Sequence, residues 1–407
     1  MAAMIGADVE QLRSLARSFD AAATALERDR MTVGDAIRIK AWIGPVAVRF
    51  RAEWDSAHSL KVSAAAARLR AAAATLKRNA DEQEGASAAA GGGIGHAATT
   101  RNSLALKWES MTSAERAALP TNKLAVYGYS DSVPPSVRDE VNRMLLERYL
   151  ADTSAPDYAR KAVAYRQIEA TLRAHPDARL LLLDPDAGSQ VHAAIALGDV
   201  ETADHVGVFV QGLQSRTDKA NGISEPVGAA EHLRSQVDAS LRSSGRANET
   251  SAMVVWMGYD SPQGGILNAT MTQYGEAGSR GLAEFADGIR RANPNAHLTG
   301  VGHSYGSYVT GLAAQRTDAF DDVVIFGSPG IGADRASDLN ISGHLYVLEG
   351  PRDLVADSAR FGKDPDRIPD ARVLATDSTT GHGSYLDDGS RSQRNIAGVI
   401  AGGSAAR

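Results

Sequence analysis

The chain has 407 residues, of which 43% are hydrophobic and 23% are charged, and its formal net charge is −6. This composition is typical of a globular protein with a sizeable core, and the acidic balance gives no reason to expect nucleic-acid binding. The absence of cysteine excludes disulfides, thiol nucleophiles and thiolate metal sites.

The first part of the chain, residues 1–85, predicts an all-α helical hairpin. Apolar residues recur every three or four positions from Val9 to Leu26 and again after Pro45, which is typical of amphipathic helices. Gly44 and Pro45 lie between the two patterns and break the helix. The N-terminus lacks the apolar core of a Sec signal peptide, and no run of the chain is long enough to predict a transmembrane helix.

Three further segments follow the hairpin. Residues 86–103 contain "ASAAAGGGIG" and predict a flexible linker, because such a composition cannot build a core. Residues 104–177 have helical patterns and are a candidate cap over an active site. Residues 178–407 alternate short apolar runs with helical stretches, which predicts an α/β fold with a mainly parallel sheet and helices on both faces. The apolar runs are residues 178–184, 190–197, 205–212, 252–259, 297–304, 322–329 and 344–351.

The fifth apolar run ends in a Gly-x-Ser-x-Gly motif, Gly302-His303-Ser304-Tyr305-Gly306, and a helical pattern follows it. A serine on a tight turn from strand to helix is presented as a nucleophile, and the flanking glycines avoid Cβ clashes. The N–H groups at the start of the following helix favour a developing negative charge. We therefore expect Ser304 to be a nucleophile and the Tyr305 N–H to be one oxyanion donor. A chance match in an ordinary loop is the alternative.

A nucleophilic serine needs a histidine base, and the base needs an orienting carboxylate. Asp353 follows the seventh apolar run, where a strand end is expected, and His382 lies further on in a glycine-bounded loop. Asp357 is the fallback for the acid and Asp334 is a weaker alternative. The order Ser304, Asp353, His382 is the one that accompanies this serine motif.

Ligands gather at the carboxyl ends of parallel strands, so residues that follow other apolar runs are further candidates. Gly212 allows a close backbone approach, and we expect the N–H of Leu213, or that of Gln214, to be the second oxyanion donor. Gly212, Gln214, Tyr259 and Asp260 are candidates for the substrate pocket, although Asp260 is more typical of a helix cap or loop ligand than of a catalytic group. Phosphate-loop, dinucleotide and zinc motifs are absent, so we expect neither a metal nor a cofactor.

Residues from about 104 to 400 resemble an actinobacterial α/β-hydrolase family of unknown function. The resemblance rests on "SVRDEVNRMLL", "HVGVFVQGL", "VVWMGYDSP", "GHSYGS" and the strand-end "GPRD". It implies an α/β-hydrolase fold and a triad of Ser304, Asp353 and His382. The family more often has proline where this chain has Gln211.

Residues 5–85 resemble the Trp-x-Gly helical hairpins that type VII secretion systems export. The resemblance rests on Trp42-Ile43-Gly44 between the two helices, and it implies a helical partner protein and export. The family's Tyr-x-x-x-Asp/Glu signal is missing after the second helix, and the matches at Tyr127 and Tyr165 lie elsewhere. Two locations therefore stay open. The protein is exported by a type VII system, or it stays in the cytoplasm and uses the hairpin for dimerisation.

These patterns predict a serine hydrolase that cleaves an acyl ester, of a small molecule or a lipid, through an acyl-enzyme intermediate. An acyltransferase with the same triad is one alternative. A catalytically dormant binding protein associated with type VII secretion is another.

Overall fold

A computed structural model describes residues 9–38, 43–90, 103–155, 157–263, 272–376, 379 and 381–403. The chain divides into two compact units, Met1–Thr100 and Arg101–Arg407. The division falls within the segment that was predicted to be a linker.

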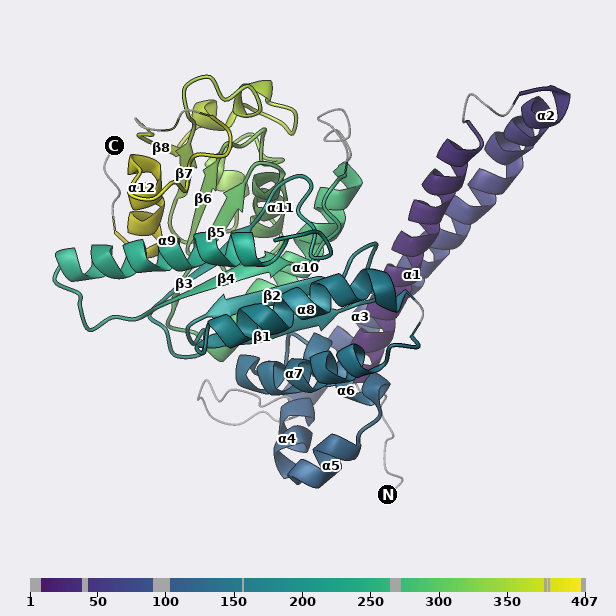
Figure 1. Cartoon of the computed structure of the whole chain (residues 1–407), viewed down its shortest axis with the longest axis horizontal. Coiled ribbons are helices and arrows are strands. Elements are labelled where there is room, and N and C mark those ends of the chain that lie inside the picture. The colour runs from purple at the N-terminus through teal and green to yellow at the C-terminus, as the bar shows by residue number, and fades with distance from the viewer. Residues whose placement is uncertain are drawn as a thin grey trace. The chain divides into compact units, whose positions relative to one another are not determined.

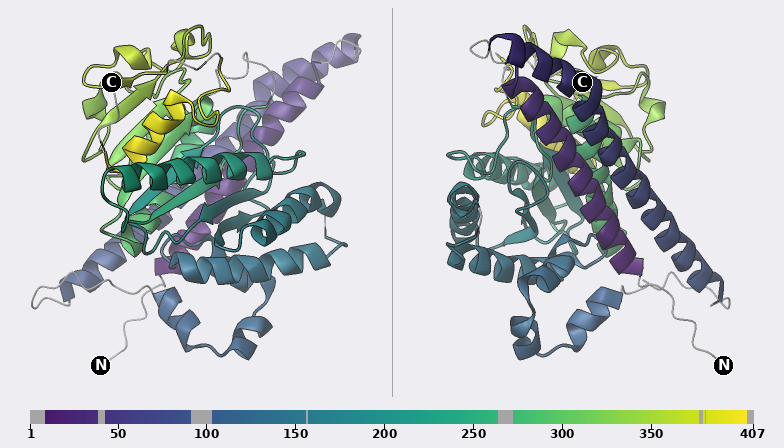
Figure 2. Two further views of the ribbon diagram at one scale, coloured as in Figure 1. Left: turned by 60° about the vertical axis from the view of Figure 1, so that its left-hand side comes forward. Right: turned by 90° about the vertical axis from the view of Figure 1, so that its right-hand side faces the viewer.

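The first unit is a pair of long helices that run side by side (Figure 2). Helix α1 (Val9–Ala36) packs along α3 (Ser59–Ala90), and α2 (Pro45–Glu53) leads into α3 through a π-helical turn (Trp54–His58). Small side chains allow this close packing, because Ala16, Ala23, Ala66 and Ala73 are all fully buried.

The turn of the hairpin has the residues that a helix start requires. Gly44 has a φ of 110°, which favours glycine, and Pro45 occupies the first position of α2, where its missing N–H costs no hydrogen bond. Trp42, on which the Trp-x-Gly resemblance partly rests, lies outside the described residues.

Helix α3 ends later than the sequence predicted. It continues to Ala90, so residues 86–90 are helical although they were assigned to the linker. The letters "ASAAA" explain the difference, since alanine is the strongest helix former and prolongs a helix that has already begun.

The second unit is built on an eight-stranded sheet with the order β1-β2-β4-β3-β5-β6-β7-β8 (Figure 1). The β1–β2 and β2–β4 pairs are antiparallel, and all pairs from β4 to β8 are parallel, as predicted for most of the sheet. The last strand was not predicted, because three residues are too few to give a periodic pattern. The strands are β1 (Ala178–Asp184), β2 (His192–Leu197), β3 (His205–Val210), β4 (Ser251–Met257), β5 (His297–His303), β6 (Asp322–Phe326), β7 (Leu345–Leu348) and β8 (Arg372–Leu374).

Both faces of the sheet are buried, and alternate strand residues belong to two separate cores. In β3, for example, Phe209 packs into one core while Val208 and Val210 pack into the other. Because both faces are covered, the strands have continuous apolar runs, which is why the sequence located them. Helices α7 (Pro135–Ala151), α8 (Tyr158–Ala174), α9 (Ser224–Ser243) and α12 (Arg391–Ile400) contribute to the first core, and α10 (Thr272–Ala292) and α11 (Tyr305–Ala314) contribute to the second.

The segment that was a candidate cap forms α4 (Ser103–Ser110), α5 (Ser113–Ala118), α6 (Thr121–Tyr129), α7 and α8. Both α6 and α7 pack on β1, the edge strand that lies furthest from β8 in the sheet. The cap prediction is therefore wrong for these two helices, whose apolar faces cover the β1 edge instead.

Side chains of α7 also bind the backbone of β1 directly. The Asp139 carboxylate accepts a hydrogen bond from the N–H of Leu180 at 2.7 Å, and the Asn142 amide donates to the carbonyl of Leu180 at 3.0 Å. The guanidinium of Arg143 donates to the carbonyl of Ala178 at 2.7 Å. These bonds satisfy polar groups of the strand that the sheet alone leaves without partners.

Helix α8 reaches further, to the segment that follows β3. The side-chain amide of Gln167 donates to the carbonyl of Lys219 at 2.5 Å and accepts a hydrogen bond from the N–H of Ile223 at 3.2 Å. Among the helices of the described residues, none is long and apolar enough to cross a membrane.

Candidate active site

Ser304 lies at the junction of β5 and α11, where the sequence predicted a strained turn. Its backbone has φ 55° and ψ −130°, a conformation that residues other than glycine rarely adopt. Neighbouring backbone groups hold it there: its N–H donates to the carbonyl of Phe326 at 3.1 Å, and its carbonyl accepts a hydrogen bond from the Ser307 hydroxyl.

The glycines around Ser304 are required by close packing. A Cβ atom on Gly306 would overlap the carbonyl oxygen of Val210, because α11 begins directly against the end of β3. A Cβ atom on Gly302 would lie 2.6 Å from the Cα of Ser307, and one on Gly212 would lie 2.9 Å from the Oγ of Ser304. The Gly-x-Ser-x-Gly spacing thus reflects the contact of three chain segments at one point.

The structure brings the predicted serine, histidine and aspartate together. The Nε2 of His382 lies 2.8 Å from the Oγ of Ser304, and its Nδ1 lies 2.9 Å from both carboxylate oxygens of Asp353. In the tautomer with its proton on Nδ1, the ring donates to the carboxylate and accepts the serine proton, which is the geometry that activates a serine. Asp353, rather than Asp357 or Asp334, is therefore the carboxylate bonded to the histidine.

Asp353 is almost fully buried, with 2% of its surface exposed. Burial raises the pKa of this carboxyl group, but hydrogen bonds from His382 and Tyr385 more than offset that effect and lower the pKa to about 2. The N–H groups of Val355 and Ala356 also donate to it, at 3.1 and 3.3 Å. Asp353 therefore stays ionised beside the imidazole at neutral pH.

Two residues next to this group were not predicted to belong to the site. The buried hydroxyl of Tyr385 donates to Asp353 at 2.8 Å and accepts a hydrogen bond from the N–H of Gly350 at 2.7 Å. His303 stacks on Phe326, and its Nε2 donates to the backbone carbonyl of His382 at 2.9 Å. Burial lowers the pKa of His303 to about 4, so this ring is neutral and acts as a support for the loop of the base.

The segment after β3 borders Ser304, as predicted from Gly212. The side chain of Leu213 is half-buried there, and that of Gln214 is exposed. The N–H of Gln214 donates to the carbonyl of Pro262 at 3.1 Å. This bond engages the alternative donor, so Leu213 remains our prediction for the second N–H of an oxyanion hole.

Tyr259 and Asp260 were candidates for the substrate pocket, and the structure shows both bonded to neighbouring loops, which for Asp260 agrees with the loop-ligand role. Tyr259 is buried and its hydroxyl donates to the carbonyl of Gln211 at 2.7 Å. Asp260 accepts hydrogen bonds from the N–H of Ser189 at 3.0 and 2.7 Å and lies 3.2 Å from the Nε2 of His192. Burial raises the pKa of Asp260, but His192 more than offsets this and brings it to about 2. Both residues brace neighbouring loops.

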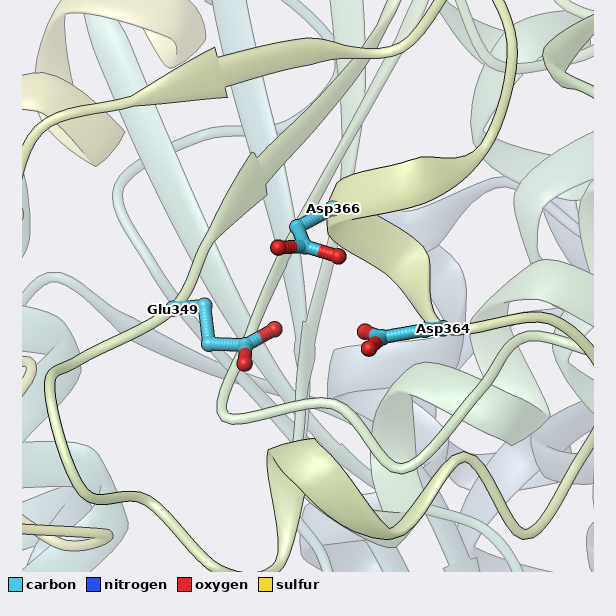
Figure 3. A group of neighbouring side chains, drawn as sticks. All are labelled: Glu349, Asp364 and Asp366. Atoms are coloured by element: carbon cyan, nitrogen blue, oxygen red, sulfur yellow. The ribbon is translucent and has the colours of Figure 1, made fainter.

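A group of three carboxylates, Glu349, Asp364 and Asp366, lies in the region between β7 and β8 (Figure 3). One oxygen from each lies within 4.8 Å of the others, a spacing that could suit a hard cation. The sequence did not lead us to expect a metal, because Glu349 is too far along the chain from Asp364 and Asp366 for the three to form a motif. Burial, a hydrogen bond with Asp357 and the charge of Asp364 together raise the pKa of Glu349 to about 8. At neutral pH, a shared proton can therefore relieve the repulsion.

Residues 184–363, which include Ser304 and Asp353, match a family model described as Alpha/beta hydrolase. An uncharacterized protein of Mycobacterium tuberculosis is 33% identical over 244 residues, covering 58% of this chain and 90% of the relative. A second uncharacterized protein of that species is 28% identical over 286 residues, covering 60% of this chain and 41% of the relative. The alignment with a dienelactone hydrolase structure from Anabaena variabilis covers 56% of this chain and 96% of that protein, with 12% identity and a TM-score of 0.35.

Replacing Gly306 by alanine should destabilise the protein by about 1–3 kcal/mol, because the new Cβ overpacks the contact between α11 and β3. Gly228 in α9 is a matched control, since nothing lies within 4 Å of a Cβ atom there. Gly228→Ala should be neutral or stabilise the helix by up to about 1 kcal/mol. Urea unfolding of both variants measures the two effects, and equal changes would contradict the packing argument.

Replacing Glu349 by glutamine should change how stability depends on pH. The folded-state pKa of about 8 lies above the ordinary value of about 4.3, so folding favours the protonated form. The stabilisation is present at low pH and is lost as the pH rises from about 4.3 through 8. Glu349→Gln should therefore melt at a higher temperature than the wild type above pH 8 and lose less stability between pH 5 and 8.5.

Thermal melting at several pH values measures this difference. Glu225→Gln, at an exposed position in the first turn of α9, is the control and should follow the wild-type slope. A Glu349→Gln variant with the wild-type slope would show that Glu349 does not take up a proton on folding.

Proposed function

The chain belongs to the alpha/beta hydrolase family, and we propose that it is a serine hydrolase that cleaves acyl esters through Ser304, His382 and Asp353. The observation that carries the proposal is the position of His382, which is hydrogen-bonded to the serine hydroxyl on one side and to the buried carboxylate on the other. About a third of the His382 side chain is exposed, so a substrate can approach the pair from solvent.

In the proposed reaction, the Oγ of Ser304 attacks the acyl carbonyl carbon while its proton passes to the Nε2 of His382. The tetrahedral intermediate collapses, the bond to the alcohol oxygen breaks, and His382 returns the proton to the leaving alcohol. A water molecule then attacks the acyl-enzyme by the same route and releases the acid. Asp353 stays ionised throughout, holding the ring in one tautomer and stabilising the imidazolium that forms.

The proposed oxyanion donors are the N–H groups of Tyr305 and Leu213. Tyr305 is the first residue of α11, so the positive end of the helix dipole lies at the site. Leu213 follows the glycine that lies against Ser304. Loss of one such donor typically costs about a hundredfold or more in rate.

A second proposal concerns the first unit, which we propose binds a helical partner protein and directs type VII export. Several large apolar side chains of this unit are exposed. They are Leu15, Val33, Ile43, Val46, Val48, Phe50 and Leu60. Tyr127 and Tyr165 belong to the core of the second unit and are 5% and 3% exposed, so neither ring is accessible as an export signal. The proposal therefore relies on a signal supplied by the partner.

Ser304→Ala should abolish labelling by a fluorophosphonate probe and should lower the rate of p-nitrophenyl ester hydrolysis by about a thousandfold or more. The reason is that no other group replaces the nucleophile. Ser235→Ala, at an exposed position in α9, is the matched control and should behave like the wild type. A series of esters from acetate to laurate then gives the preferred acyl-chain length.

The same assay separates the alternatives. Transfer of the acyl group to an added alcohol, in preference to water, would identify an acyltransferase. A wild-type protein that the probe does not label would be a dormant hydrolase fold, and the enzyme proposal would be abandoned.

The partner proposal predicts that the full chain co-purifies with a helical-hairpin protein of its host and that Phe50→Asp weakens this association, because a charge then faces an apolar contact. Leu106→Asp is the control, since Leu106 is exposed on the second unit. If the wild-type chain purified from its own host without such a partner, the proposal would be contradicted.

A further inference from the structure

We infer that Tyr259 and Ser215 are positioning residues that fix the orientation of the Leu213 N–H in the oxyanion loop, defined as residues 211–217. This inference rests on the proposed serine hydrolase function. Neither residue is bonded to Ser304, His382 or Asp353 in the described structure, so both would act through the peptide between Gly212 and Leu213.

Both hydroxyl groups are directed at carbonyl oxygens of the oxyanion loop. The hydroxyl of Ser215 donates to the carbonyl of Gly212 at 3.0 Å, and the hydroxyl of Tyr259 lies 3.4 Å from the same oxygen. Tyr259 also donates to the preceding carbonyl, that of Gln211, at 2.7 Å. Side-chain hydroxyls therefore hold two consecutive carbonyl groups, those of Gln211 and Gly212.

The planarity of the peptide bond converts this carbonyl contact into control of a donor. In a trans peptide, the C=O of one residue and the N–H of the next point in opposite directions. Ser215 holds the Gly212 carbonyl and Tyr259 holds the carbonyl before it, so the Leu213 N–H is directed away from the Ser215 hydroxyl. If this peptide were flipped, a carbonyl oxygen would replace the donor and would repel the developing oxyanion.

The loop needs such control because glycine is unavoidable at position 212. A Cβ atom there would lie 2.5 Å from the Cβ of Ser304, so no side chain fits. Glycine, however, adopts positive and negative φ with similar ease, and its own backbone does little to prevent a flip. The neighbouring residue Gln214 has a φ of 59°, which shows that this loop already contains a disfavoured conformation held by outside contacts.

Tyr259 is itself held rigidly, as a positioning residue must be. Its ring is 3% exposed and stacks between Trp256 and Tyr305, with ring centroids 5.9 and 6.4 Å apart. Burial raises the pKa of its hydroxyl, so the group remains a protonated donor at neutral pH.

The Ser215 side of the contact is fixed as well. The hydroxyl of Ser261 donates to the carbonyl of Ser215 at 2.7 Å, and the side-chain oxygen of Gln190 accepts a hydrogen bond from the N–H of Thr217 at 2.8 Å. The segment after β4 and the loop before β2 thus clamp the oxyanion loop from two directions.

The test is the second-order rate of fluorophosphonate labelling, together with kcat and KM for p-nitrophenyl butyrate. Tyr259→Phe keeps the stacked ring and removes only the hydroxyl. Ser215→Ala removes the serine hydroxyl and keeps the Cβ atom. We expect Tyr259→Phe to lower the labelling rate and kcat about tenfold or more with little change in KM, because the lost orientation matters only when the oxyanion forms. Ser215→Ala should lower them in the same way.

Tyr308→Phe is the matched control, since it removes a hydroxyl from another buried tyrosine that packs on Tyr305. It should leave the labelling rate and kcat within about twofold of the wild type. The double variant Tyr259→Phe/Ser215→Ala should lose less than the product of the single effects, because the two hydroxyls hold consecutive carbonyls of one short backbone stretch.

The outcomes distinguish this inference from the proposed function. A wild-type chain that is not labelled would overturn the proposed function, and the inference with it. A labelled wild type with Tyr259→Phe and Ser215→Ala at wild-type rates would overturn the inference alone. Losses in Tyr259→Phe that Tyr308→Phe reproduces, or that appear in KM rather than kcat, would also reject it, since they would indicate a general effect on packing.

Discussion

The strained backbone of Ser304 is the constraint on which the rest of the site depends. A serine with a φ of 55° must be held from several sides, and the sheet supplies the supports. The register pairs Val210 of β3 with Gly302 and pairs Phe326 of β6 with His303, so three strands end beside the turn. Each neighbouring loop can then contribute one component of the site, and glycine is needed wherever two backbones meet.

Ionisation at this edge of the sheet depends on which partners each acid finds. Asp353 and Glu349 are four positions apart, yet the pKa of the first falls to about 2 and that of the second rises to about 8. Burial raises both pKa values. Asp353 is surrounded by donors, the ring of His382, the hydroxyl of Tyr385 and two N–H groups, whereas Glu349 faces other carboxyl groups. The same strand end thus provides a permanent anion and an acid that can retain its proton.

The sequence predicted the features that depend on order along the chain. Ser304, Asp353 and His382 could be found because parallel strands end at one edge, so residues after successive strands meet there. The sequence did not predict the features that depend on contacts between distant loops. Asp260 was a candidate for the pocket, but Ser189, in the loop before β2, and His192, the first residue of β2, bind it. Likewise, a helical pattern identified α7 without indicating that the surface it covers is the β1 edge.

The two ends of the sheet differ in a way that bears on solubility during folding. An unpaired strand edge can recruit a strand from another molecule and start aggregation. At one end, Asp139, Asn142 and Arg143 of α7 occupy backbone groups of β1. At the other end, β8 has only three residues, which offers an incoming strand few partners. Both edges of this open sheet therefore offer few free backbone groups to a strand from another molecule.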